Sequence, residues 1–204
     1  MDRHAAWAIA GCIPLLAAVF FAATRVLPPF WGYFLALGVY WGCVLIPLIA
    51  WRGGFRRGRL AFRWPSAWLV AANVVVIGGV AFAATRALQE HALPLWIIAV
   101  MGCCAILNGT LEELFWRGTV LTDHATRSEQ ATQLALFVGW HVALLFAGGV
   151  IVTGGAAGLL GGALIGGLLW TATRMQTGTA GFGAVAHVCL NLFAFTELAA
   201  RNAI

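Results

Sequence analysis

Long apolar segments constrain this chain more than any other feature of its 204 residues. Seven of them approach the roughly twenty residues that a helix needs to cross about 30 Å of hydrocarbon. We place them at residues 5–24, 31–51, 66–85, 94–118, 131–148, 155–174 and 179–199. The sequence therefore predicts an all-α polytopic membrane helix bundle with about seven transmembrane helices.

The composition agrees with this assignment. Hydrophobic residues make up 62% of the chain and charged residues 9%, whereas soluble domains carry about 25% charged residues. The mean hydropathy is +0.90. We expect a single integral membrane domain. Its first part, residues 1–93, consists of transmembrane helices without a recognised motif.

The basic residues orient the chain. The net charge is +5, and every basic residue is arginine. Five arginines occupy one loop after the second segment: Arg52, Arg56, Arg57, Arg59 and Arg63. Such a loop is typical of the cytoplasmic side, so we expect a cytoplasmic N-terminus, contacts with membrane lipids and no nucleic-acid partner. The exclusive use of arginine favours a bacterial inner (plasma) membrane protein.

Glycines recur at intervals of four in the sixth segment, at Gly154, Gly158, Gly162 and Gly166. In membranes, small residues at this spacing let two helices approach closely. We interpret this ladder as a packing face.

Ionisable side chains inside apolar segments are costly and often functional. The stretch GTLEELFWRGTV, residues 109–120, contains three of them. Glu113 and Arg117 are four residues apart, with the acid first, which is the favourable order for an ion pair on a helix. Glu112 points about 100° away. Asn108, one turn earlier, could orient it, and an acid without a dedicated cation is a candidate general base.

Two later segments each carry polar side chains. His141 follows Phe137 by one helical turn, which would let the two rings pack. His187 and Asn191 are also one turn apart and could donate hydrogen bonds to one oxyanion. Each of these residues also has a purely structural interpretation, as an interhelical hydrogen-bonding or packing residue. Together with Glu112, these three side chains supply the groups that a hydrolase needs to activate water and hold an oxyanion.

Three motifs then occur in order on successive segments: EELFWR matches EExxxR, FVGWH matches FxxxH, and HVCLN matches HxxxN. Over residues 94–199 the chain resembles the CPBP (CAAX protease and bacteriocin-processing, or Abi) family of glutamic-type intramembrane proteases. The resemblance implies that Glu112 and His141 activate the water and that His187 and Asn191 form the oxyanion hole. It also implies that Glu113 and Arg117 organise the site.

Several alternatives remain open at this stage. Glu112, His141 and His187 could hold a divalent metal such as zinc, but the chain lacks an HExxH motif, and we favour a site without metal or other cofactor. The expected substrate is a membrane-anchored protein or peptide, such as a C-terminal sorting signal, a bacteriocin or pheromone precursor, or a CAAX-like tail. A proton-coupled transporter and a non-enzymatic immunity or scaffold protein are the rival classes. The oligomeric state is left open.

Overall fold

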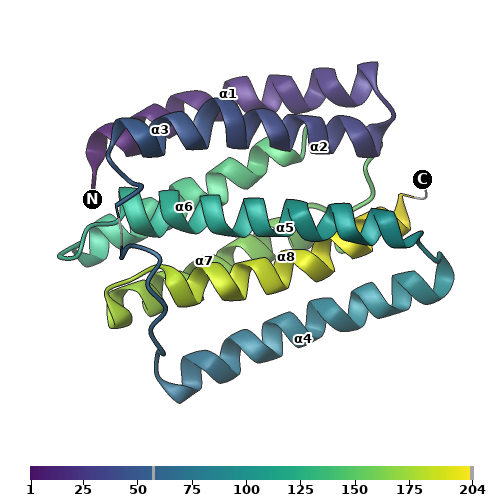
Figure 1. The fold of residues 1–204 in the computed structure, drawn as a ribbon. Coiled ribbons are helices and arrows are strands. Elements are labelled where there is room, and N and C mark those ends of the chain that lie inside the picture. Colours follow the sequence, from purple (N-terminus) through teal and green to yellow (C-terminus); the bar gives the residue numbers. More distant parts are fainter. Residues whose placement is uncertain (57, 203–204) are drawn as a thin grey trace.

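The structure is a computed structural model that describes residues 1–56 and 58–202, so Arg57 of the basic loop lies outside the described residues. Its helices form seven passes (Figure 1). They are α1 (Arg3–Val26); α2 (Pro29–Val39), η1 (Tyr40–Leu45) and α3 (Ile46–Trp51), which form one continuous pass; α4 (Ala67–Glu90); α5 (Leu95–Phe115), which continues into η2 (Trp116–Val120); α6 (Arg127–Leu144); α7 (Gly155–Thr177); and α8 (Gly181–Arg201).

The all-α prediction is confirmed. No strand occurs in the described part of the chain, and six of the passes are long and apolar enough to cross a membrane. The pass outside that group is α6, whose first two turns are polar. The two termini lie at opposite ends of the bundle, as an odd number of passes requires (Figure 1).

The fifth predicted segment is displaced. We predicted residues 131–148, whereas α6 begins at Arg127 and ends at Leu144. A capping box fixes the start, because the Thr126 hydroxyl accepts from the Glu129 backbone N–H and the Glu129 carboxylate accepts from the Thr126 N–H. The TRSE sequence carries this signal, which the search for apolar residues missed.

Two short π-helical turns interrupt otherwise regular helices. The first, η1, lies just before Pro47. Proline has no N–H to donate to the preceding turn, and a wider turn is one way to accommodate it. The second, η2, contains Arg117. Isolated π turns occur frequently at functional sites.

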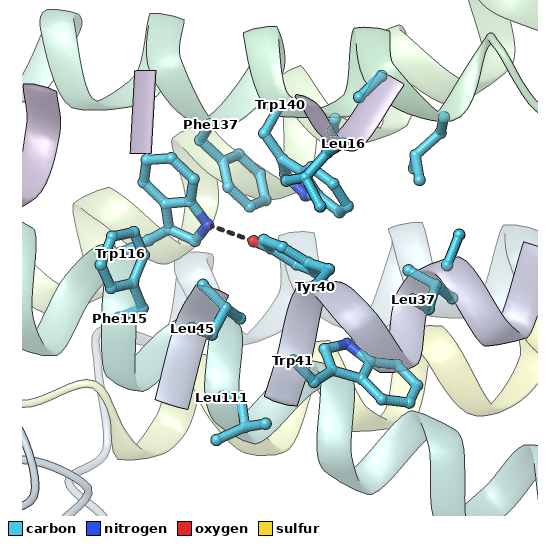
Figure 2. Close-up of a cluster of buried hydrophobic side chains, with 14 of the residues drawn as sticks. Leu16, Leu37, Tyr40, Trp41, Leu45, Leu111, Phe115, Trp116, Phe137 and Trp140 are labelled. Atoms are coloured by element: carbon cyan, nitrogen blue, oxygen red, sulfur yellow. Dashed lines mark hydrogen bonds between the residues drawn. The ribbon is translucent and has the colours of Figure 1, made fainter. Parts of the chain in front are cut away.

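The helix α5 occupies the centre of the bundle and packs along α8 (Figure 1). The outer face of α8 is covered by α4, while α1 packs against α2 and α6. Aromatic rings from η1, the end of α5, η2 and α6 pack together inside the bundle (Figure 2). Tyr40 stacks on Trp140 at 3.6 Å between ring centroids, and the Tyr40 hydroxyl accepts a hydrogen bond of 3.3 Å from the Trp116 indole.

Candidate active site

Glu112 lies near the C-terminal end of α5 and is 1% exposed. The indole N–H of Trp140, on α6, donates to its Oε1 at 2.9 Å. Its Oε2 has no hydrogen-bond partner among the described residues and lies 3.7 Å from Nε2 of His187. One oxygen of this carboxylate is therefore held in place, and the other is left for a further ligand.

Glu113 has different partners, as the sequence predicted. Its Oε1 accepts from Nη1 of Arg117 at 2.8 Å, and both side chains are fully buried. The same oxygen lies 3.2 Å from Nδ1 of His187. Arg117 does not bond Glu112 in the structure, so the two adjacent glutamates occupy separate hydrogen-bonding environments.

Several groups compensate in part for the burial of Arg117. Nη2 donates to the carbonyl of Gly167 at 3.2 Å. The guanidinium carbon lies 4.2 Å from the ring centroid of Phe137 and 5.5 Å from that of Trp170. Buried charges are stable only when they are paired and hydrogen-bonded. These contacts meet that requirement for both terminal nitrogens, while Nε has no hydrogen-bond partner among the described residues, and the ion pair fixes the position of Glu113.

His187 lies between the two carboxylates. Nδ1 faces Glu113 and Nε2 faces Glu112. The indole of Trp170 stacks on the imidazole, with ring centroids 3.9 Å apart and an interplanar angle of 20°. The imidazole is thus fixed in orientation by an acid at one edge and by an aromatic face.

Two glycines let α8 approach α5 closely enough for these contacts. A Cβ at Gly109 would lie 2.6 Å from the Val188 backbone nitrogen, and a Cβ at Gly183 would lie 2.9 Å from Oε2 of Glu113. These positions, rather than the predicted ladder on α7, form the close small-residue interface of the site.

His141 lies on α6, one residue after Trp140. Its Nδ1 lies 2.8 Å from the carbonyl of Phe137, and the two rings pack edge to face at 4.8 Å, which is the contact the sequence predicted. Nδ1 donates in this arrangement, because a carbonyl only accepts, and Nε2 is left as the acceptor. The structure shows no direct hydrogen bond between His141 and Glu112 among the described residues.

A cavity of about 310 Å³ brings the predicted residues together. Glu112, His141, His187 and Asn191 all line it, each from its predicted segment. The Asn191 amide nitrogen is buried and has no hydrogen-bond partner among the described residues. The remaining wall is mainly apolar and comes largely from α4, α7 and α8.

The interpretation of the α7 glycines as a packing ladder is wrong. Gly158 and Gly162 line the cavity, and a Cβ at Gly162 would meet no atom within 4 Å. Gly154 is the residue that precedes the helix, with a left-handed φ of 73°. The close contact of α7 with α6 is at Gly167, where a Cβ would lie 2.6 Å from the Leu134 side chain. Four-residue spacing alone did not show which face of α7 is buried.

The expected contact between Asn108 and Glu112 is also wrong. The Asn108 side-chain oxygen accepts from the indole of Trp41 at 2.8 Å. The residue that orients Glu112 is Trp140. No sequence pattern indicated it, because its contact depends on how α6 packs against α5. Trp170 was missed for the same reason.

The four lining residues do not fit a metal ion well. No group of three or more His, Cys, Asp or Glu side chains in described positions is close enough to hold one. Asn191 is a poor zinc ligand. We derive no step through a metal.

The fold and the buried acid–histidine cluster define a polytopic helical membrane protein with a hydrolase-like centre. Residues 91–193, about half of the chain, match the family model described as "Type II CAAX prenyl endopeptidase Rce1-like". The chain belongs to this family, a CPBP family of membrane peptide hydrolases, as the three motifs predicted. No curated protein and no solved structure matches it.

Proposed function

We propose that the chain is an intramembrane endopeptidase that cleaves a peptide bond with a water activated by Glu112 and His141. The observation that carries the proposal is the single cavity into which Glu112, His141, His187 and Asn191 all project. Three of these groups retain hydrogen-bonding capacity: Oε2 of Glu112, Nε2 of His141 and Nδ2 of Asn191.

The proposed reaction begins with a water molecule near Oε2 of Glu112. This oxygen takes one proton from the water, while Nε2 of His141 accepts a hydrogen bond from the other O–H and orients the water. The water oxygen bonds to the carbonyl carbon of the substrate. The carbonyl π electrons move onto its oxygen, which becomes an oxyanion.

The oxyanion is stabilised by Nδ2 of Asn191 and Nε2 of His187. For this role, His187 is protonated on both nitrogens, with Nδ1–H directed at Glu113. The Glu113–Arg117 pair keeps the imidazole in that orientation. When the intermediate collapses, the C–N bond breaks and Glu112 returns its proton to the leaving amine.

The proposed substrate is a membrane-anchored protein or peptide. The cavity wall is mainly apolar, which suits a substrate that stays associated with lipid. C-terminal sorting signals, bacteriocin or pheromone precursors and CAAX-like tails all have this chemistry. We further propose a bacterial inner-membrane location, with the N-terminus and the arginine-rich loop in the cytoplasm.

A comparison of peptide termini tests the proposal. Membrane peptides from cells that express the wild-type chain, Glu112→Gln or Glu90→Gln at equal levels are analysed by mass spectrometry. Glu90 is an exposed glutamate at the end of α4 and outside the cavity, so it is a matched control. New termini should appear with wild type and Glu90→Gln and disappear with Glu112→Gln.

Identical termini in all three samples would argue against proteolysis, provided that the folded protein is present and that the sample includes the membrane proteins of its native host. A transporter or scaffold protein would give that result. Loss of the new termini in Glu90→Gln as well would mean that the effect is not specific to the cavity.

A further inference from the structure

A second cavity, separate from the one that contains Glu112, lies at the end of the bundle that carries the N-terminus. Its volume is about 380 Å³. The lining comes from the α3–α4 loop, from η2 with the turn that follows it, and from the C-terminal end of α7. Its lining residues include three arginines, Arg56, Arg59 and Arg174, and two threonines, Thr119 and Thr122.

Two of these arginines are held by backbone groups of η2. Arg174 donates from Nε to the carbonyl of Arg117 at 2.8 Å, and its side chain is 8% exposed. Arg59 donates from Nη1 to the carbonyl of Gly118. A guanidinium has five N–H donors in a rigid fork. Both arginines therefore keep donors for a ligand after they have braced the turn.

The loop that supplies Arg56 and Arg59 is fixed against the rest of the molecule. The backbone N–H of Ala180 donates to the Arg59 carbonyl at 2.8 Å. Arg63 donates to the carbonyl of Thr177 at 3.1 Å. A Cβ at Gly181 would lie 2.4 Å from the Ala61 carbonyl oxygen, so the loop and the start of α8 are in close contact. These contacts hold the backbone of the loop from Arg59 to Arg63 against the start of α8.

The positive charges are only partly balanced. Asp123 pairs with Arg174, but its side chain is 73% exposed. Arg56 makes no side-chain hydrogen bond or ion pair with another described residue. The pKa of Arg59 lies below its usual value because burial, and then the positive charges of Arg56 and Arg174, disfavour its charged form. An anion between the three groups would relieve that repulsion.

Exposed tryptophans at both ends of the arginine-rich loop indicate that this loop lies near the lipid headgroups. Trp51, at the end of α3, is 58% exposed; Trp64 and Trp68, around the start of α4, are 72% and 62% exposed. Tryptophan is enriched at the boundary between hydrocarbon and water. The arginine cavity opens beside the same loop, so a phosphate in the headgroup layer is at the correct depth.

We propose that this cavity binds the phosphate of an acidic phospholipid headgroup, with Arg56, Arg59 and Arg174 as donors. Arginine suits phosphate because its planar fork pairs with two oxygens at once. A bound lipid would also link the headgroup layer to η2, since Arg59 and Arg174 hold the carbonyls of that turn.

The test measures lipid binding to the purified full-length protein, so its outcome is independent of hydrolytic activity. The protein in detergent is titrated with dioleoyl phosphatidylglycerol or dioleoyl phosphatidylcholine. Native mass spectrometry gives lipid occupancy and thermal denaturation gives the shift in Tm. The variants are Arg56→Gln and, as a control with the same charge change, Arg86→Gln, an exposed arginine near the end of α4 at the opposite end of the bundle.

Phosphatidylglycerol should bind wild type and Arg86→Gln and raise their Tm, whereas phosphatidylcholine should have little effect. Arg56→Gln should bind roughly fivefold more weakly, the change that corresponds to about 1 kcal/mol for one arginine near an anionic surface. Because Arg56 has no described side-chain partner and its charge repels Arg59, its substitution should not lower the Tm without lipid.

Equal binding of the two lipids, or equal behaviour of Arg56→Gln and Arg86→Gln, would overturn the proposal. A third arm adds inorganic phosphate at the same concentration as the lipid. No Tm shift is expected there. A shift equal to that of phosphatidylglycerol would assign the site to a free anion and overturn the lipid assignment.

Discussion

Trp140 donates its indole N–H to Oε1 of Glu112 at 2.9 Å, from the position immediately before His141. One turn of α6 thus supplies both a group that holds the proposed base and a second group that lines the same cavity. The Tyr40 ring stacks on the Trp140 indole and keeps it in place. The carboxylate is therefore oriented across three separate passes of the chain.

Substitution of Trp140 by Phe tests this orientation. Phe keeps an aromatic ring against Tyr40 but removes the N–H, and hydrogen bonds to charged groups contribute about 1.5–3 kcal/mol. We expect kcat/KM to fall by roughly tenfold or more, with little loss of folded protein. The measurement is cleavage of the substrate that the analysis of peptide termini identifies.

Trp41→Phe is the matched control for that experiment. Trp41 also donates a buried indole hydrogen bond, but its acceptor is Asn108. Because this acceptor is a neutral amide, loss of the bond should cost about 0.5–1.5 kcal/mol of stability, and it should affect kcat/KM much less. Equal losses of kcat/KM in both variants would show that Trp140 acts through general packing.

The Glu113–Arg117 pair should dominate the stability of the site. Removing one partner of a buried ion pair costs about 3–5 kcal/mol, because the other charge is left buried without compensation. We expect Arg117→Met to lower the free energy of unfolding by that amount, as measured by denaturant titration in mixed micelles. Glu113→Gln combined with Arg117→Met should recover part of the stability and none of the activity, since His187 loses its partner.

Arg52→Gln provides the comparison. Arg52 pairs with Asp2 at 2.7 Å, but its side chain is 30% exposed. Partly exposed pairs contribute less than about 1 kcal/mol. If Arg52→Gln and Arg117→Met destabilised the protein equally, burial would not be the reason for the importance of Arg117.

The sequence predicted those parts of the site that depend on a single helix. The Glu113–Arg117 and Phe137–His141 contacts both join residues four apart, so helical geometry alone brings them together. The assignment of Glu112 and Glu113 to different environments follows from the same geometry. The all-α fold followed from segment length and hydropathy.

The parts that failed depend on contacts between helices. Trp140 reaches Glu112, and Trp170 reaches His187, only because α6, α7 and α8 surround the end of α5. Local spacing suggested Asn108 instead, and it suggested a packing face on α7 where the structure has a cavity wall. Residue spacing within one helix does not show which helical faces meet, and the four cavity residues were expected together only because the three motifs resemble those of a known family.

Chelation tests the proposed metal-free reaction. The candidate metal donors Glu112, His141 and His187 come singly from α5, α6 and α8, and no group of three such side chains lies close enough to hold an ion among the described residues. We expect activity to be unchanged after dialysis against a strong chelator and after addition of zinc. A loss on chelation that zinc restores would contradict the proposal and would require Glu112, His141 and His187 to rearrange around the ion.

Gly183→Ala should disturb the site without removing any functional group. The added Cβ would lie 2.9 Å from Oε2 of Glu113, closer than real Cβ contacts allow, and Glu113 is held by both Arg117 and His187. Either the carboxylate or α8 must therefore shift, and a displacement of this kind misaligns His187. We expect kcat/KM to fall by roughly tenfold or more, because catalysis is sensitive to errors of about 1 Å in position.

Gly161→Ala on α7 is the control, since a Cβ there meets no atom within 4 Å and alanine is the better helix former. An active Gly183→Ala enzyme would mean that the spacing between α5 and α8 is not what positions His187.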